Sequence, residues 1–192
     1  MTSQRHNAEA LPEGILDATR AAVLAVGVRR TTLTDVARRA GVSRMTVYRL
    51  VPDVNTLILA VMTRDLGAVF ADAERTARRR RTARARLVAI VVEICRRLPD
   101  EPLLRRVLDL DPELLLPYLT GRLGSTQRLA ISQVAPLVAD GQADGSIRRG
   151  DVETIARMLV LLATPYVVSA AVMREHDPFP ELERLIDRWL RP

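Results

Sequence analysis

The sequence has no lysine, a single cysteine, two histidines and few aromatic residues. Because Cys95 is alone, a disulfide within the chain is excluded, and a reducing cytoplasm is the expected location. His6 lies in a polar tail and His176 lies near a loop proline, and Cys95 has no evident base near it in the sequence. There is also no metal-ligand spacing and no glycine-rich phosphate loop. We therefore expect no enzyme, no metal site and no cofactor.

Long apolar runs are also missing. The first residues contain no apolar segment typical of a secretory signal. The longest uncharged stretch lies between Arg157 and Arg174, is interrupted by Thr164 and Pro165, and is shorter than the roughly 20 apolar residues that a membrane span requires. This stretch predicts a buried helix, and we expect no membrane partner.

The arginines are unevenly distributed along the chain, whose net charge is +6. Residues 1–86 contain 16 arginines and 8 acidic residues, whereas the remainder contains 13 arginines and 15 acidic residues. The basic N-terminal part suggests contact with a polyanion, although solvated helices also carry surplus arginine. The run Arg78–Arg81 fits either a second nucleic-acid patch or a solvated helix end, and we favour the helix end.

Apolar residues recur at helical spacing in every periodic segment, and no segment alternates as a strand would. Glycine, proline and capping residues divide the chain into helices with short connections. The sequence therefore predicts an all-α fold. Helices are expected at about 11–26, 33–40, 43–50, 53–78, 82–98, 101–109, 111–120, 122–141, 151–174 and 178–190.

Residues 33–50 have the residue types that a helix-turn-helix needs at fixed offsets. Ala37 is small enough for the helix crossing, and Gly41, four positions later, suits a left-handed turn. Thr32 and Asp35 form a capping box ahead of the first helix, and Ser43 caps the second. The apolar positions expected to fill the wedge between the helices are Val36, Ala40, Val42, Val47 and Leu50.

An ordinary pair of short amphipathic helices around a glycine turn would show part of this pattern. The complete set of offsets, caps and arginines favours DNA binding over that reading.

Over about residues 11–60 the sequence resembles the N-terminal signature of the TetR family of transcriptional regulators. The matching stretches are GVRRTT (27–32), DVA (35–37), AGVS (40–43), TVY (46–48) and PD (52–53), ending at Leu57. Residues 140–148 are more loosely similar to the loop that precedes the family's penultimate helix. The resemblance implies a three-helix DNA-binding domain at 1–52 and a larger helical ligand-binding and dimerisation domain at 53–192.

The resemblance also implies a role for individual residues. Thr32 would touch a backbone phosphate, the side chains at 44–46 would face base edges, and Tyr48 would pack against the sugar–phosphate backbone. Arginine can bind guanine through two hydrogen bonds, and threonine and methionine can contact the thymine methyl group. The predicted DNA-binding residues are Thr32, Ser43, Arg44, Met45, Thr46, Tyr48 and Arg49.

Two positions depart from the family pattern. Val51 stands where the family usually has an aromatic residue, and Val54 stands where a lysine commonly contacts phosphate. Losing one phosphate contact lowers the slope of log affinity against log salt by about one unit. Arg38, Arg39 or Arg49 could supply a replacement contact.

The last two helices, at about 151–174 and 178–190, are the homodimer interface that the resemblance implies. The first is apolar nearly all round, so every side of it must be covered. The second carries an apolar stripe formed by Phe179, Leu182, Leu185, Ile186 and Trp189. Both helices could instead belong to the core of one chain, but a two-fold symmetric operator favours a two-fold symmetric protein.

The ligand pocket is less well indicated than the DNA-binding segment. Leucine, valine and alanine dominate the candidate helices, which favours an aliphatic or lipid-like effector over a flat aromatic cation. Some polar, polarisable or aromatic residues on these helices could orient such a ligand, although each also fits plain core or surface. They are Cys95, Tyr118, Gln127, Met158 and Tyr166.

The predicted function is a ligand-responsive transcriptional regulator. It would be a repressor that binds palindromic double-stranded operator DNA as a homodimer and leaves it when a small apolar effector binds. The alternative is a constitutive DNA-binding or protein-interaction module of the same fold without a ligand, for which we would expect a filled core.

Overall fold

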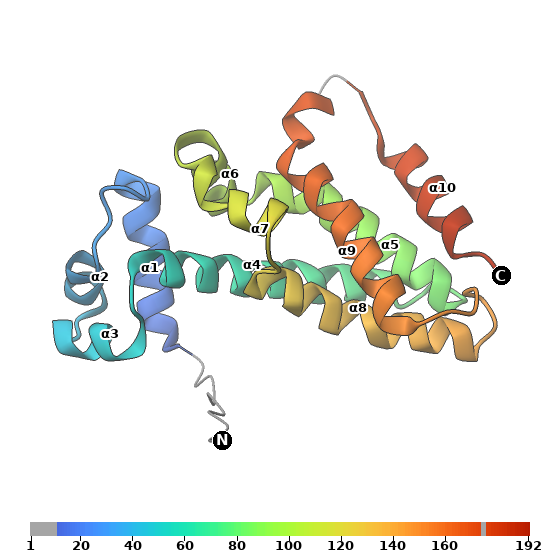
Figure 1. Ribbon diagram of the computed structural model, residues 1–192, viewed down its shortest axis with the longest axis horizontal. Coiled ribbons are helices and arrows are strands. Elements are labelled where there is room, and N and C mark those ends of the chain that lie inside the picture. The colour runs from blue at the N-terminus through green and yellow to red at the C-terminus, as the bar shows by residue number, and fades with distance from the viewer. Residues whose placement is uncertain (1–10, 174–175) are drawn as a thin grey trace. The chain divides into compact units, whose positions relative to one another are not determined.

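The computed structural model describes residues 11–173 and 176–192, and these residues form helices and turns without a strand (Figure 1). The predicted all-α class is therefore confirmed. The α-helices are α1 (Glu13–Val26), α2 (Leu33–Ala40), α3 (Arg44–Leu50), α4 (Val54–Ala77), α5 (Ala83–Arg97), α6 (Pro102–Leu110), α7 (Leu116–Thr120), α8 (Ser125–Ala143), α9 (Val152–Val168) and α10 (Phe179–Leu190). The 3-10 helices are η1 (Leu98–Asp100), η2 (Pro112–Leu114) and η3 (Ala170–Met173).

The chain forms two compact units, Met1–Val61 and Met62–Pro192. The division falls inside α4, so this helix starts in the first unit and continues in the second. The sequence placed the boundary at 52/53, directly ahead of the same helix.

The first unit has a small hydrophobic core, which is enclosed by α1, α2, α3 and the start of α4. Its centre includes Val36 and Val47, one from each helix of the helix-turn-helix, and both are fully buried. Ala37 is also buried, as the close crossing of two helices requires. Val42, which the sequence placed in the wedge, is instead 36% exposed, because it lies in the turn that leads away from α2.

Gly41 makes the tight turn between α2 and α3 possible. Its φ is +68°, in the left-handed region, and its amide donates to carbonyl groups of the last turn of α2. Ser43 follows and accepts a hydrogen bond from the Thr46 amide at 3.1 Å, so α3 begins at Arg44, three residues after the Gly41 cap of α2. These caps fix the crossing of the two helices.

The second unit is built around α5, which contacts α8, α9 and α10. Most of α5 is buried, including Leu87 and Ile90. The loop between α8 and α9 is hydrogen-bonded to the start of α5. The Asp144 carboxylate accepts from the Ala83 amide at 2.8 Å, and the Ser146 hydroxyl accepts from the Arg84 amide at 3.1 Å. The Ala83 hydrogen bond is the main cause of the lowered pKa of Asp144.

Three helices differ from their predicted extents by three residues or more at one end, and one of them is α8, which was predicted at 122–141 and forms at Ser125–Ala143. The segment 111–120 was expected to be one helix but forms η2 and then α7, since Pro117 has no amide hydrogen to continue the ladder. The segment 151–174 ends its α-helix at Val168, three residues after Pro165, and continues as η3. Helix α9 runs through Pro165, and the Ser169 amide still donates to the Pro165 carbonyl at 2.9 Å, so this proline does not itself end the helix.

Helix α4 is the one helix in the described part of the chain that is long and apolar enough to cross a membrane. A third (33%) of its apolar window is buried within the structure. Core helices of folded proteins satisfy the same two criteria, so this single helix is weak evidence for a membrane span.

Candidate nucleic-acid interface and ligand pocket

Helix α3 turns one side toward the core of the first unit and exposes the other. Val47 is fully buried, whereas Met45 is 69% exposed and Tyr48 is 54% exposed. Arg44 and Arg49 are exposed as well, and neither has a hydrogen-bond or ion-pair partner among the described residues. Four of the seven predicted DNA-binding side chains are therefore available on one short helix.

The remaining three predicted residues take part in helix caps. The hydroxyl groups of Ser43 and Thr46 lie 2.8 Å apart and share a hydrogen bond. The Thr32 hydroxyl accepts from the Asp35 amide at 3.1 Å and donates to the Asp35 carboxylate at 2.6 Å. Because this hydroxyl stabilises the charged form, it is the main reason that the pKa of Asp35 lies below its usual value. A phosphate at Thr32 would compete with a carboxylate for the same proton.

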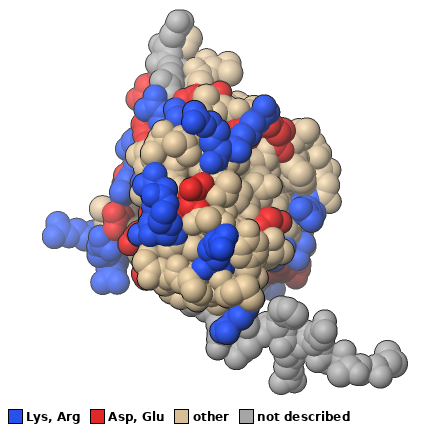
Figure 2. Space-filling view, turned by 90° about the vertical axis from the view of Figure 1, so that its left-hand side faces the viewer, with Lys and Arg blue, Asp and Glu red and all other residues tan. Residues whose placement is uncertain are grey.

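The surroundings of α3 are rich in positive charge. Residues 11–61 contain seven arginines and four acidic residues. Arg30 and Arg39 are exposed and have no ion-pair partner among the described residues, whereas Arg38 lies 3.6 Å from Asp35. Figure 2, which views the side that carries α2 and α3 in Figure 1, shows blue basic side chains over more of the surface than red acidic ones. Arg30 was not singled out from the sequence, although its place beside the cap residue Thr32 is a usable signal.

The two departures from the family pattern both lie at the core of the first unit. Val51 is 4% exposed and belongs to the buried cluster. Val54 is half-buried and packs against the same cluster. Both valines therefore contribute to packing, and neither supplies a cation.

The five predicted ligand residues are not gathered in one place. Cys95 is buried in α5, and burial raises the pKa of its thiol to about 12. Tyr166 is half-buried, and its ring meets Phe179 edge-on at 6.3 Å. Burial is also the main reason that the pKa of Tyr166 is raised. Met158 is 42% exposed on α9.

The other two predicted ligand residues, Tyr118 and Gln127, are joined by a structural hydrogen bond. The Gln127 amide nitrogen donates to the Tyr118 carbonyl at 3.0 Å, and its amide oxygen accepts from the Gly124 amide at 2.9 Å. The Gln127 side chain thus closes the start of α8. Within the described residues, no group of three or more His, Cys, Asp and Glu side chains is arranged to hold a metal ion.

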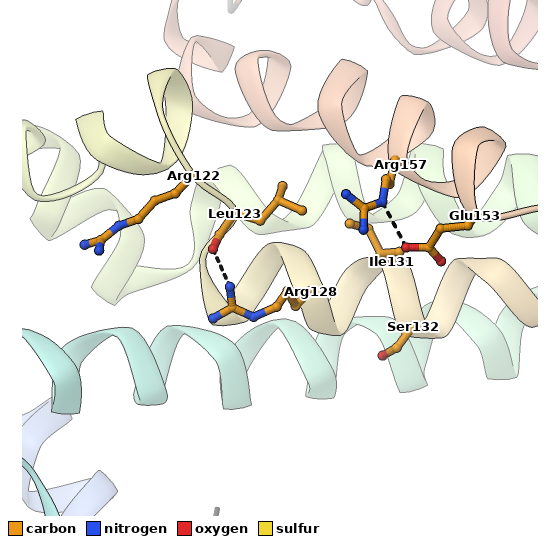
Figure 3. Close-up of a pocket in the computed structure, with 7 residues that line it drawn as sticks. All are labelled: Arg122, Leu123, Arg128, Ile131, Ser132, Glu153 and Arg157. Carbon is orange, nitrogen blue, oxygen red and sulfur yellow. Dashed lines mark hydrogen bonds and ion pairs between the residues drawn. The ribbon is translucent and has the colours of Figure 1, made fainter. Parts of the chain in front are cut away.

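The second unit has an open pocket of about 530 Å³ beside α8 and α9 (Figure 3). None of the five predicted ligand residues lines it, and no local pattern could have indicated it, because its walls come from segments 20 or more residues apart. Its lining residues are Arg122, Leu123, Arg128, Ile131, Ser132, Glu153 and Arg157.

Comparison with known sequences places the helix-turn-helix in a described family. Residues 15–53 match the family described as "Bacterial regulatory proteins, tetR family". An HTH-type transcriptional regulator of Mycobacterium bovis is 35% identical over 159 residues, which is 83% of this chain and 81% of that protein. The similarity therefore extends well beyond the DNA-binding unit.

Solved structures share the fold over nearly the whole chain. The transcriptional repressor QsdR of R. erythropolis, from the TetR family, has a TM-score of 0.74 at 18% identity and covers 93% of each chain. The transcriptional regulator FadR of Bacillus subtilis, solved in complex with stearoyl-CoA, has a TM-score of 0.62 at 16% identity and covers 93% of this chain and 99% of that one. By its helix-turn-helix and its similarity to these relatives along most of its length, the chain belongs to the TetR family of bacterial transcriptional regulators.

Proposed function

We propose that this regulator is a ligand-responsive repressor that binds a palindromic operator as a homodimer. The observation that carries the proposal is the exposed side of α3, where Arg44, Met45, Tyr48 and Arg49 stand in solvent beside buried Val47. A helix of this kind can enter the major groove with its first residues at the base edges. Arg44 and Met45 would read bases, while Tyr48 and Arg49 would contact the backbone.

The dimer is proposed through α9 and α10, as in the sequence prediction. Large apolar side chains are exposed along one side of α9, at Met158, Leu161 and Leu162. Leu185 on α10 is 57% exposed, while Ile186 beside it is buried. Exposed apolar side chains at helical spacing mark a surface that another protein surface covers. A second copy of the chain, placed by two-fold symmetry, would cover it with the same residues.

Effector binding would act through α4, since this helix has residues in both units. A ligand that prefers one arrangement of the dimer lowers operator affinity only by its differential affinity for the two arrangements, typically about 1–3 kcal/mol. An aliphatic effector in the second unit is consistent with the mainly aliphatic core residues of α5, such as Leu87, Ile90 and Val91. The protein would act in the cytoplasm, where its operator lies.

The test is a fluorescence-anisotropy titration against the DNA upstream of the protein's own gene, with a scrambled duplex as control, at two salt concentrations. We expect specific, salt-dependent binding with two protomers per site. Equal and weak binding to both duplexes would contradict the proposal and favour an interaction module. A constitutive DNA-binding module would bind the operator specifically but would respond to no compound in an effector screen.

A further inference from the structure

One end of the second unit carries a surplus of arginine that the proposed function does not use. The connection between α4 and α5 lies there beside the loop between α8 and α9 (Figure 1). Segments 78–86 and 144–151 together contain eight arginines and two acidic residues, whereas the rest of residues 62–192 contains 13 arginines and 16 acidic residues. Positive charge is therefore concentrated at one end of a unit that is otherwise acidic.

Polar contacts hold this end together. Besides the hydrogen bonds from the Ala83 and Arg84 amides to the α8–α9 loop, the Arg84 Nε lies 3.1 Å from the carboxylate of Asp187 on α10. The Arg148 amide in turn donates to the Leu190 carbonyl at 2.8 Å. The two basic segments are thus fixed to each other and to the end of α10, and they present their charge as one surface.

The two acidic residues of these segments serve backbone amides. The Asp144 carboxylate accepts from the amides of Ala83 and Ser146, and the Asp151 carboxylate accepts from the Thr154 amide at the start of α9. Five arginine side chains are exposed and have no hydrogen-bond or ion-pair partner among the described residues, and none lies on α9 or α10, the helices proposed for the dimer. They are Arg78, Arg79, Arg80, Arg81 and Arg149.

The end of α4 does not account for the run Arg78–Arg81. Arg75 already places a cation in the last turn of α4, and the favourable effect of a cation on a helix end falls off beyond that turn. The four arginines follow the helix in a turn, where their like charges repel one another until an anion compensates them. A partner with repeated negative charges is the chemistry that this surface fits.

The composition of the surface selects among such partners. No large apolar side chain is exposed in segments 78–86 and 144–151, so these segments have nothing to insert into a bilayer and no ring on which single-stranded bases could stack. They also lack the aromatic or apolar anchor on which binding to another protein usually depends. Duplex DNA needs only cations, because its backbone presents one negative charge per about 1.7 Å of helix axis.

We propose that Arg78–Arg81 and Arg149 form a second DNA-binding surface, which contacts the phosphates of a duplex segment other than the operator. The protein would then hold two stretches of DNA, one read by α3 in the first unit and one bound without sequence preference by the second unit. This function goes beyond repression by occupation of a single operator.

The test uses the full-length protein carrying R44Q/R49Q, which removes two cations of α3 and lowers the contribution of the first unit to binding of a scrambled duplex. In anisotropy titrations we expect this binding to weaken by about 10²-fold between about 50 mM and about 200 mM salt, as four or five phosphate contacts imply. Adding R78Q/R80Q/R81Q should weaken binding about tenfold or more at the lower salt and reduce the slope of log affinity against log salt by about two to three units.

Two further sets of substitutions separate charge at this surface from other effects. R105Q/R122Q/R128Q removes the same charge from exposed arginines elsewhere in the second unit and should change binding little. R78K/R80K/R81K keeps the charge and should preserve binding, because a lysine also neutralises a phosphate. Equal weakening by the two glutamine sets, or none by R78Q/R80Q/R81Q, would overturn the proposal. Tighter arginine-dependent binding to phosphatidylglycerol–phosphatidylcholine vesicles than to the duplex would also overturn it.

A capture experiment separates this inference from the proposed function. The operator duplex is immobilised and saturated with protein, and a labelled scrambled duplex is passed over it. We expect capture by the wild-type protein and not by R78Q/R80Q/R81Q, with equal occupancy of the operator, since the substituted residues lie outside the unit that carries α3. Operator occupancy without capture would overturn the second surface. Failure to bind the operator specifically would contradict the proposed function alone, because the scrambled-duplex titration requires no operator.

Discussion

Arg44 is the side chain on which base reading is expected to depend most. It is exposed, lies at the start of α3 and has no partner among the described residues, so it can reach a base edge without breaking an existing contact. We predict that Arg44→Ala weakens operator binding by about 1–3 kcal/mol, and that the loss disappears when the base pair read by Arg44 is replaced. Anisotropy titrations against a set of single-base-pair operator variants measure this.

The matched control is Arg79→Ala, which removes the same charge from an exposed arginine of the second unit. We expect it to change operator affinity little at physiological salt. If Arg44→Ala instead weakens binding to all duplexes equally and lowers the salt slope by about one unit, Arg44 contacts phosphate and base reading must come from other residues.

Which residues belong to the predicted DNA-binding surface was easier to infer from the sequence than which of their side chains are available to contact DNA. The sequence predicted seven DNA-binding side chains. Three of them carry the short hydroxyl groups of serine or threonine, which form hydrogen bonds with neighbouring polar groups at the helix caps. Ser43 and Thr46 therefore bind each other, and Thr32 binds Asp35. Arginine and methionine have no such short-range partner in α3, which is why Arg44 and Met45 remain in solvent. The roles of all seven residues in DNA binding stay predictions until they are tested.

The turn between α2 and α3 provides the prediction at the scale of elements. Gly41 has a φ of +68°, and a Cβ built on it meets no atom within 4 Å, so only backbone conformation opposes a side chain there. We predict that Gly41→Ala lowers the free energy of unfolding by about 1–2 kcal/mol, the cost of the left-handed conformation for an ordinary residue. Urea unfolding followed by circular dichroism measures the change.

Two comparisons isolate the backbone effect. Gly41→Asn should cost less than Gly41→Ala, because asparagine tolerates the left-handed region better. Gly14→Ala, at the second residue of α1, also has open space around its Cβ and no positive φ, so it should not lower stability. Equal effects of the two alanine substitutions would refute the conformational explanation.

The extents of most helices followed from the sequence because their ends are set by local chemistry. The Ser43 and Asp151 side chains accept hydrogen bonds from the amides that open α3 and α9, as side chains of these types do at helix starts. The segment 111–120 was predicted less well, because two prolines interrupt an otherwise helical pattern and the outcome depends on which hydrogen bonds each one removes. Local signals are therefore strongest where a cap is present and weakest around proline.

Assembly of the whole molecule depends on contacts that no local pattern encodes. The pocket beside α8 and α9 joins residues such as Arg128 and Arg157, which lie far apart in the sequence. Cys95, Tyr118, Gln127, Met158 and Tyr166 were predicted from single helices, and the structure distributes them over the core, a helix cap and the surface of α9. A pattern on one helix can indicate which side is apolar, but it cannot indicate which other helix meets that side.

The exposed apolar side of α9 gives the prediction for the whole molecule. Leu161 is 48% exposed in the single chain, and a charged residue there would have to be buried without a partner in a dimer formed through α9. We predict that Leu161→Glu yields a folded monomer and weakens operator binding about 10²–10⁴-fold, because two linked heads bind far more tightly than one. Light scattering after size exclusion gives the oligomeric state, and anisotropy gives the affinity.

Leu116→Glu on α7 is the matched control, since Leu116 is 55% exposed and lies outside the predicted interface. It should keep the dimer and its operator affinity, which separates loss of the interface from a general effect of added negative charge. A Leu161→Glu protein that remains a dimer would place the interface on another surface. Α monomer with full operator affinity would contradict the requirement for two heads, because a single recognition helix contacts only one half-site of a palindrome.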